Sequence, residues 1–203
     1  VDAGDGKYYI QSKLGTVLDV TSASAAAGTN VQTYTFNQST AQKWTLLETE
    51  KTLYSIMGKT NVSVSQMVKF YKNKATVSYP YSNVSEAPTI EKFCQIYKEE
   101  SEVEGVKAEV AFAQAMMETG FLKFGGDVKK DQYNFAGIGA IGGGSSGAKF
   151  DSIRIGIRAH VQHLKAYASK EALKQPVVDP RFQYVKRGSA EYVQWLGQKE
   201  NPN

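Results

Sequence analysis

The pattern of apolar and polar positions changes near residue 50. Before this point, short runs alternate apolar and polar side chains, with Gly, Ser and Asn between them. Alternation over a few residues is typical of strands. The runs are Lys7–Ser12, Leu14–Val20, Val31–Tyr34 and Gln42–Leu46. After residue 50, apolar residues recur every three or four positions, which predicts helices. We therefore expect a small all-β fragment over residues 1–50 and a mainly α domain over residues 51–203.

The second region contains five helical patterns. Ser63 or Ser65, Pro88 and Ser152 are typical of helix starts, and Gly105 is typical of a helix end. The acidic run from Glu99 to Glu104 is interpreted as a solvated face. The expected helices run from Ser63 or Ser65 through Tyr71, from Pro88 to Gly105, from Val106 to Thr119, from Ser152 to Ala168 and from Ser189 to Leu196.

The Val106–Thr119 helix is apolar nearly all round, a pattern that predicts burial. One acid, Glu118, stands in its last turn, just before Gly120. Burial raises the pKa of a carboxyl group, and the negative end of the helix dipole acts in the same direction. Such an environment suits a general acid. A solvated glutamate at the helix end is the alternative that this segment leaves open.

Other residues could also carry chemistry. Glycoside hydrolysis usually needs two carboxyl groups, and Asp127, on a glycine-flanked loop, is our candidate for the second. The string Gly137–Gly142 matches a dinucleotide fingerprint literally. It lacks a following helix, and we interpret it as a loop beside a groove. His160 and His163 lack the spacing of zinc-protease helices and are interpreted as packed or surface residues. We expect no metal and no cofactor.

Composition narrows the function classes. The net charge of +4 and pI of 8.9 favour an anionic surface such as a bacterial wall, but are too weak and dispersed for nucleic acid. No apolar run is long enough to span a membrane. The single cysteine, Cys94, excludes an internal disulfide framework and is expected to be a buried structural thiol.

The strand region resembles one repeat of the ricin-type β-trefoil lectins, through YYIQSKLGTVLDV, AAAGTNVQTYTFN and the closing Gln-x-Trp at Gln42 and Trp44. Only one such repeat is present, so we expect residues 1–50 to be the last repeat of a longer carbohydrate-binding domain. The resemblance implies sugar contacts at Asp19, Tyr34 and Asn37. A purely structural repeat is the alternative.

Three separated motifs of residues 51–203 resemble the glucosaminidase domain of glycoside hydrolase family 73, of the clostridial autolysin type. They are AFAQAMMETGFLKFGGDVKKDQYNFAGIGAIGGG, KFDSIRIGIRAHVQHLKAYAS and VDPRFQYVKRGSAEYVQWLG. The resemblance implies a lysozyme-like fold with a glycan cleft. It places the catalytic acid at Glu118, and substrate-binding residues at Asn134, Phe135 and Gly137 beside Tyr133.

The implied reaction is hydrolysis of the β-1,4 bond between N-acetylglucosamine and N-acetylmuramic acid. The implied partner is peptidoglycan, with other wall carbohydrate at the lectin repeat, and the implied location is the secreted, cell-wall space. Relatives continue past the motif matching Glu200–Pro202, so we expect a C-terminally truncated catalytic domain that lacks a cleft residue, a Tyr. An N-acetylmuramidase, a lytic transglycosylase and a non-catalytic wall-binding protein are the alternatives. The second catalytic group stays open between a carboxylate and the substrate's own acetamido group.

Overall fold

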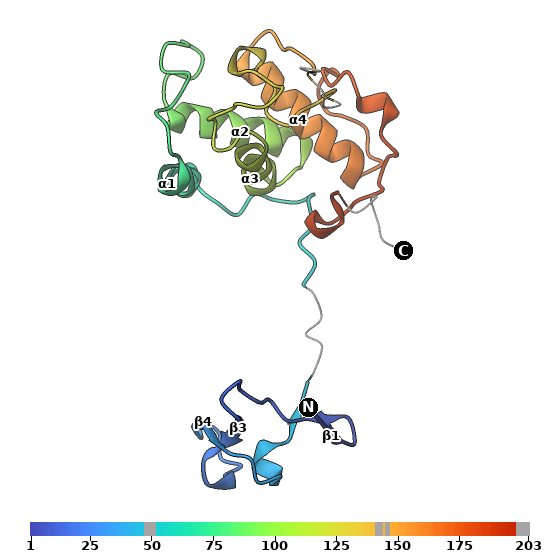
Figure 1. Cartoon of the computed structure of the whole chain (residues 1–203). Coiled ribbons are helices and arrows are strands. Elements are labelled where there is room, and N and C mark those ends of the chain that lie inside the picture. The colour runs from blue at the N-terminus through green and yellow to red at the C-terminus, as the bar shows by residue number, and fades with distance from the viewer. Residues whose placement is uncertain (47–51, 141–143, 145–146, 198–203) are drawn as a thin grey trace. The chain divides into compact units, whose positions relative to one another are not determined.

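The chain forms two compact units. The structure is a computed structural model that describes residues 1–46, 52–140, 144 and 147–197. Unit 1 is Val1–Thr52 and unit 2 is Leu53–Asn203 (Figure 1). Each unit has its own elements, and each is described separately below.

Unit 1 contains two small antiparallel sheets. Strands β1 (Asp2–Gly4), β2 (Lys7–Tyr8) and β5 (Trp44–Thr45) form the first sheet, in the order β1-β2-β5. Strands β3 (Thr16–Val20) and β4 (Val31–Thr35) form the second. The indole N–H of Trp44 donates to the carbonyl of Leu18 over 3.1 Å, which ties the closing strand of one sheet to β3 of the other. The expected all-β character is confirmed.

The described part of unit 2 contains four helices, and three of them begin at capping signals in the sequence (Figure 1). Ser63 and Gln66 form a capping box at α1, and the hydroxyls of Thr89 and Ser152 accept a backbone N–H at the starts of α2 and α4. Gly105 ends α2 in the left-handed conformation, with φ of 74°. The helices are α1 (Val64–Lys74), α2 (Ile90–Glu104), α3 (Ala108–Glu118) and α4 (Ile153–Ala168).

Short 3-10 turns join these elements. They are η1 (Thr21–Ala23), η2 (Thr40–Gln42), η3 (Lys130–Gln132), η4 (Phe182–Tyr184) and η5 (Val193–Trp195). No helix in the described part of the chain is long and apolar enough to cross a membrane.

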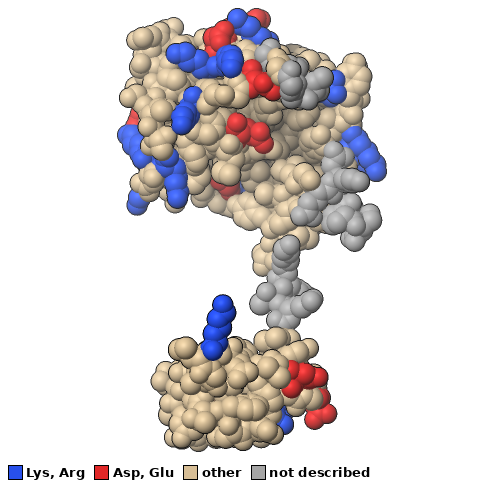
Figure 2. Space-filling view, viewed as in Figure 1, with Lys and Arg blue, Asp and Glu red and all other residues tan. Residues whose placement is uncertain are grey.

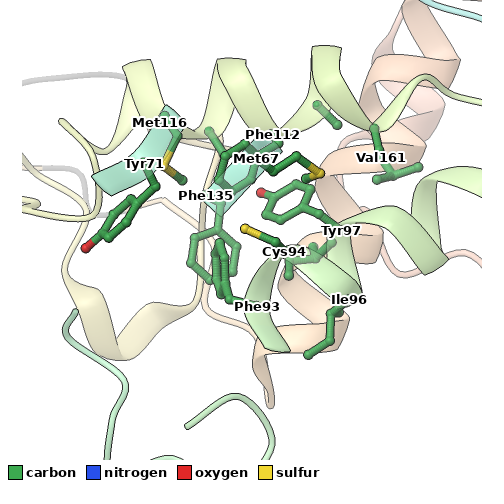
Figure 3. Packing of buried hydrophobic residues seen from close by; sticks show 14 of the residues in the cluster. Met67, Tyr71, Phe93, Cys94, Ile96, Tyr97, Phe112, Met116, Phe135 and Val161 are labelled. Atoms are coloured by element: carbon green, nitrogen blue, oxygen red, sulfur yellow. The ribbon is translucent and has the colours of Figure 1, made fainter. Parts of the chain in front are cut away.

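Aromatic rings from different elements meet in the core of unit 2 (Figure 3). Phe93 of α2 lies 5.1 Å from Phe135, in the loop between α3 and α4, and 5.4 Å from Tyr97, ring centroid to ring centroid. Tyr97 in turn packs on Phe112 of α3 at 5.6 Å. Cys94 is fully buried beside them, as expected, and burial raises the pKa of its thiol to about 12. This core joins α2, α3 and the loop that carries Phe135.

The acidic run at the end of α2 is only in part the solvated face that we expected, because Glu102 is exposed whereas Glu100 and Glu104 are buried. The Glu104 carboxylate and the Lys165 ammonium of α4 form an ion pair at 3.0 Å, and both side chains are fully buried. Glu100 is also buried and accepts hydrogen bonds from Arg154 and Arg158. Burial raises the pKa of Glu100, but hydrogen bonds from these arginines outweigh it and the pKa is lowered overall. The run therefore attaches α2 to α4.

The helix expected from Ser189 to Leu196 is also wrong. Only the 3-10 turn η5 forms there. The N–H of Ile56 donates to the carbonyl of Glu191, and the N–H of Val193 donates to the carbonyl of Tyr54. Because these backbone groups pair with the entry of unit 2, they are not free to form a helix.

Candidate active site

The last turn of α3 leaves the core. Met116 is fully buried, whereas the next residue, Met117, is 72% exposed, and Glu118 is exposed as well. The expectation that Glu118 emerges from a buried environment is therefore wrong. Two exposed residues follow each other because the helix ends here and its final turn faces solvent. Glu118 stands at an open surface with its carboxylate accessible.

The backbone directly after Glu118 is held in an unusual conformation. Phe121, Leu122 and Phe124 have φ values of 56°, 62° and 57°, a region that costs non-glycine residues about 1–2 kcal/mol each. The buried Thr119 fixes the turn, because its hydroxyl donates to the carbonyl of Ala115 at 2.7 Å and accepts the N–H of Leu122 at 3.0 Å. Strain of this kind is concentrated at functional sites.

Asn134 fixes the loop that faces this turn. Its amide nitrogen donates to the carbonyls of Ile138 and Ala148 at 2.9 and 3.0 Å, and its oxygen accepts the N–H of Ile138 at 2.9 Å. Asn134 and Phe135 are both buried, at 1% and 0% exposure. Each of them therefore shapes the loop from beneath, and their side chains do not face solvent.

Tyr133 and Gly137 lie at the two ends of this segment, residues 133–137, which we call the braced loop. Both residues have positive φ. The Tyr133 ring is half-buried and packs on Tyr81 at 5.8 Å, ring centroid to ring centroid. Its carbonyl lies against Gly156 of α4, where a Cβ atom would sit 1.8 Å from the carbonyl oxygen. Of the four expected substrate-binding residues, Gly137 lines a hollow with Glu118.

That hollow has a volume of about 290 Å³ and lies between the end of α3 and the braced loop. It brings Glu118 and Asp127 together. Within the described residues, neither carboxylate makes a hydrogen bond or an ion pair. Asp131 lies elsewhere, where it pairs with Lys149 at 3.7 Å. The lining residues are Glu118, Thr119, Gly120, Phe124, Gly126, Asp127, Val128, Gly137 and Ala140. The string Gly137–Gly142 runs from this lining to Ile141 and Gly142, which lie outside the described residues.

Figure 2 shows acidic side chains in the middle of one face of unit 2, with lysine and arginine side chains around its margins. Among the described residues, the lining of the hollow contains the two carboxylates and no basic residue, and such carboxylates can exchange protons with a neutral polar ligand. They could also attract a cation, but no cluster of three metal-ligating side chains occurs among the described residues.

A second hollow of about 290 Å³ was not anticipated from the sequence. It contains both histidines of α4 and the side chain of Gln114, one turn before Glu118 on α3. The histidine spacing was a visible signal, but packing was the preferred interpretation. Its lining residues are Gln114, Ala136, His160, His163, Leu164, Tyr167, Leu196 and Gly197.

In unit 1, the expected sugar-binding residues have different environments. Asp19 is 6% exposed, and its two oxygens accept hydrogen bonds from the side-chain amides of Gln32 and Gln42, each at 3.1 Å. Asn37 is exposed and its side-chain oxygen accepts a backbone N–H. Tyr34 is 52% exposed. Of these three residues, Tyr34 offers the large open surface. The Asp19 carboxylate is instead held by hydrogen bonds within the repeat.

Comparison with known proteins gave two family matches. Residues 94–201, more than half of the chain, match the glucosaminidase family, described as mannosyl-glycoprotein endo-beta-N-acetylglucosaminidase. Residues 1–77 match the ricin-type beta-trefoil lectin domain-like family, a match that runs past unit 1 and includes all of α1. These matches confirm both resemblances, and with them the mainly α, lysozyme-like class of unit 2.

A stretch of 94 residues is 55% identical to a protein of Borreliella burgdorferi whose description is "Uncharacterized protein". The stretch covers 46% of this chain and 46% of that protein, so the chain spans about half the length of the curated relative that it matches. No solved structure matches the chain.

Proposed function

The chain belongs to the glucosaminidase family, and from this premise we propose that it hydrolyses the β-1,4 bond between N-acetylglucosamine and N-acetylmuramic acid in peptidoglycan. One observation carries the proposal: Glu118 and Asp127 line the same open hollow. Neither carboxylate makes a hydrogen bond or an ion pair with the described part of the protein. A pair of carboxyl groups beside the scissile bond is what most glycosidases use.

Glu118 is the general acid in this proposal. A glycan that fills the hollow excludes water from around the carboxyl group, so that proton transfer takes place directly to the substrate. The proton passes to the glycosidic oxygen as the bond to the anomeric carbon breaks. The leaving sugar gains a hydroxyl, and N-acetylglucosamine becomes the new reducing end.

Asp127 takes the second role. It is half-buried on the loop that follows Gly125 and Gly126, across the hollow from the end of α3. As a general base it would activate a water molecule on the opposite face of the sugar, with inversion at the anomeric carbon. Attack by the substrate's acetamido group would instead give retention. Proton NMR of the freshly released reducing end distinguishes the two routes.

Two braces supply the fixed geometry that such a reaction needs. The Thr119 hydroxyl fixes the turn after Glu118, and the Asn134 amide fixes the loop that carries Gly137. Both are buried hydrogen-bonding groups with backbone partners. Preorganisation of this kind is a large part of catalysis, because the reacting groups need not be ordered during the reaction.

The test compares hydrolysis of purified peptidoglycan by the wild type and by Glu118→Gln and Asp127→Asn. Loss of a general acid should lower turnover about a hundredfold or more. Glu171→Gln and Asp151→Asn are matched controls, because both acids are exposed and their side chains make no hydrogen bond or ion pair with the described residues. Wild-type turnover in Glu118→Gln would refute the assignment. A mannosyl glycoprotein, named in the family description, is tested in parallel as the competing substrate.

Unit 1 supports a related proposal about location. We propose that unit 1 contacts wall carbohydrate through the exposed Tyr34 ring, since sugar faces stack on aromatic rings, and that the protein acts outside the cell at the wall. Tyr34→Ala should weaken pull-down by purified wall, whereas Tyr8→Ala, a tyrosine of similar exposure, should not. Equal pull-down by both variants would remove Tyr34 from the site. Intact wall mass after prolonged incubation would favour a binding-only protein.

A further inference from the structure

The second hollow adjoins the one that contains Glu118. Gln114 and Glu118 are four residues apart on α3, so they share one face of the helix. On the opposite side, Ala136 lines the second hollow and the next residue, Gly137, lines the first. A polymer bound at Glu118 therefore has the second hollow directly beside it.

A buried hydrogen-bond chain ends at this hollow. His160 is 1% exposed, and burial lowers the pKa of its imidazole to about 3, so the ring is neutral. Its Nε2 lies 2.9 Å from the Gln114 Oε1 atom, and its Nδ1 lies 3.1 Å from the Tyr97 hydroxyl. Because an amide oxygen can only accept, Nε2 carries the proton and Nδ1 accepts from Tyr97.

This series of hydrogen bonds determines which end of the Gln114 side-chain amide is available to a ligand. Its oxygen is held by His160, so its NH₂ group is the remaining polar group. Within the described residues, that NH₂ group has no hydrogen-bond partner. A histidine in an apolar core is costly unless both ring nitrogens are satisfied, as they are here. The result is a hydrogen-bond donor held in a fixed orientation beside Glu118.

His163 supplies a second polar group to this hollow, and its ring is held by a different residue, Asp179. Its Nδ1 lies 2.8 Å from Oδ2 of Asp179, whose side chain is fully buried. The other Asp179 oxygen accepts the N–H of Arg181 at 2.8 Å, which fixes the carboxylate. Because Asp179 holds Nδ1, the Nε2 atom is the ring nitrogen that is left for a ligand. The ring also packs edge-on against Tyr167 at 5.2 Å, centroid to centroid.

We propose that this hollow is a subsite for an N-acetylated sugar ring next to the cleaved bond, and that Gln114 and His163 select that sugar. The Gln114 NH₂ group would donate to the acetamido carbonyl, and the His163 Nε2 atom would form a hydrogen bond with a ring hydroxyl. Leu164, Tyr167 and Leu196 give apolar walls for the C–H face of the ring. This inference rests on the proposed function, because it takes the ligand to be the same glycan.

The experiment measures binding by calorimetry in full-length protein carrying Glu118→Gln, which prevents turnover. The probes are a β-1,4-linked N-acetylglucosamine tetramer and the corresponding glucose tetramer, which is also neutral but lacks acetamido groups. Gln114→Glu keeps an oxygen for His160 while replacing the NH₂ donor with an acceptor. His163→Asn keeps a donor toward Asp179 but removes the Nε2 atom.

Each substitution should weaken binding of the N-acetylated tetramer about tenfold. Gln114→Glu should also shrink the preference for the N-acetylated over the glucose tetramer, an effect that a general loss of folding would not produce. Gln183→Glu is the matched control, because Gln183 is exposed and lines a different hollow. In the active background, both substitutions should raise KM while kcat stays within about twofold.

Wild-type affinity and unchanged sugar preference in Gln114→Glu and His163→Asn would overturn the subsite. The measurements distinguish failure of the subsite proposal from failure of the proposed function. If the wild type binds the tetramer with this dependence but hydrolyses no glycan, the subsite stands and the hydrolase proposal fails. If hydrolysis depends on Glu118 but binding ignores Gln114 and His163, only the subsite fails.

Discussion

Replacement of Gly156 by alanine tests whether the site depends on close contact between α4 and the braced loop. A Cβ atom at this position would lie 1.8 Å from the carbonyl oxygen of Tyr133 and 2.9 Å from its carbonyl carbon. Relief of the first contact to 3.0 Å requires a movement of about 1.2 Å. Neither partner is a flexible side-chain end, because one is helix backbone and the other is loop backbone.

Two opposing terms set the size of the effect. Alanine is favoured over glycine in a helix interior by about 1 kcal/mol. Overpacking of this kind costs about 1–3 kcal/mol or more. Because the contact is with backbone and is very short, the overpacking cost lies at the upper end of that range, and we expect Gly156→Ala to lower the free energy of unfolding by about 2 kcal/mol or more. Since Tyr133 precedes the Asn134 brace, a movement of about 1 Å should also lower kcat/KM on peptidoglycan by up to about a hundredfold.

Urea denaturation and peptidoglycan turnover measure the two effects. Gly126→Ala is the control for stability, because its added Cβ would meet nothing within 4 Å and its φ is not in the left-handed region. We expect that control to be neutral or slightly stabilising. If Gly156→Ala were as stable as the wild type and equally active, the close contact would not be required and the reasoning would be refuted.

Three further results are expected. Lys165→Met should lower the free energy of unfolding by about 3–5 kcal/mol in a denaturant titration, since it leaves the buried Glu104 without its cationic partner. Lys165→Met with Glu104→Gln, which keeps an acceptor for the backbone N–H groups of Lys174 and Gln175, should recover much of the loss. Cys94 should resist a thiol reagent in the native protein and react on unfolding, because burial raises its pKa to about 12; rapid native labelling would contradict this. His160 has a folded-state pKa of about 3, below its unfolded value of about 6.5, so its neutral form contributes stability that should be lost as pH falls from about 6.5 towards 3. Urea midpoints across that range should fall less steeply in His160→Gln, and identical slopes would exclude this histidine as a source.

Local sequence signals predicted the helices well where caps and one-sided apolar stripes agreed. Ser63, Thr89 and Ser152 cap α1, α2 and α4 close to the expected starts. For α3 the expected helix was present, but its exposed end was missed. A nearly all-apolar sequence has no polar face to show which side meets solvent, so Met117 and Glu118 could not be assigned to the surface.

Pairings between distant residues account for the other errors. Glu100 and Glu104 are buried because their cationic partners lie on α4, more than fifty residues away. Local sequence gives an acidic run no sign of such partners. Likewise, Glu191 and Val193 pair with the backbone at the entry of unit 2. Helical periodicity alone cannot show that these backbone groups pair with a distant segment and not with each other in a helix.

The candidate site was predicted in part. Glu118, Asp127 and Gly137 line one hollow, a convergence that follows from loop geometry and could not be read from spacing. Gln114 had no signal of its own apart from its position one turn before Glu118. The role of His160 depends on Tyr97 and Gln114, two partners from different helices, so the His160–His163 spacing could not reveal it.

Mass spectrometry of borohydride-reduced fragments from peptidoglycan digests tests the central claim most directly. Wild-type digests should contain new ends that are reduced N-acetylglucosamine, and digests with Glu118→Gln should contain no more of them than a buffer blank. Equal yields from the two proteins would contradict the role of Glu118. New ends of N-acetylmuramic acid or of an anhydro sugar would contradict the proposed bond and reaction.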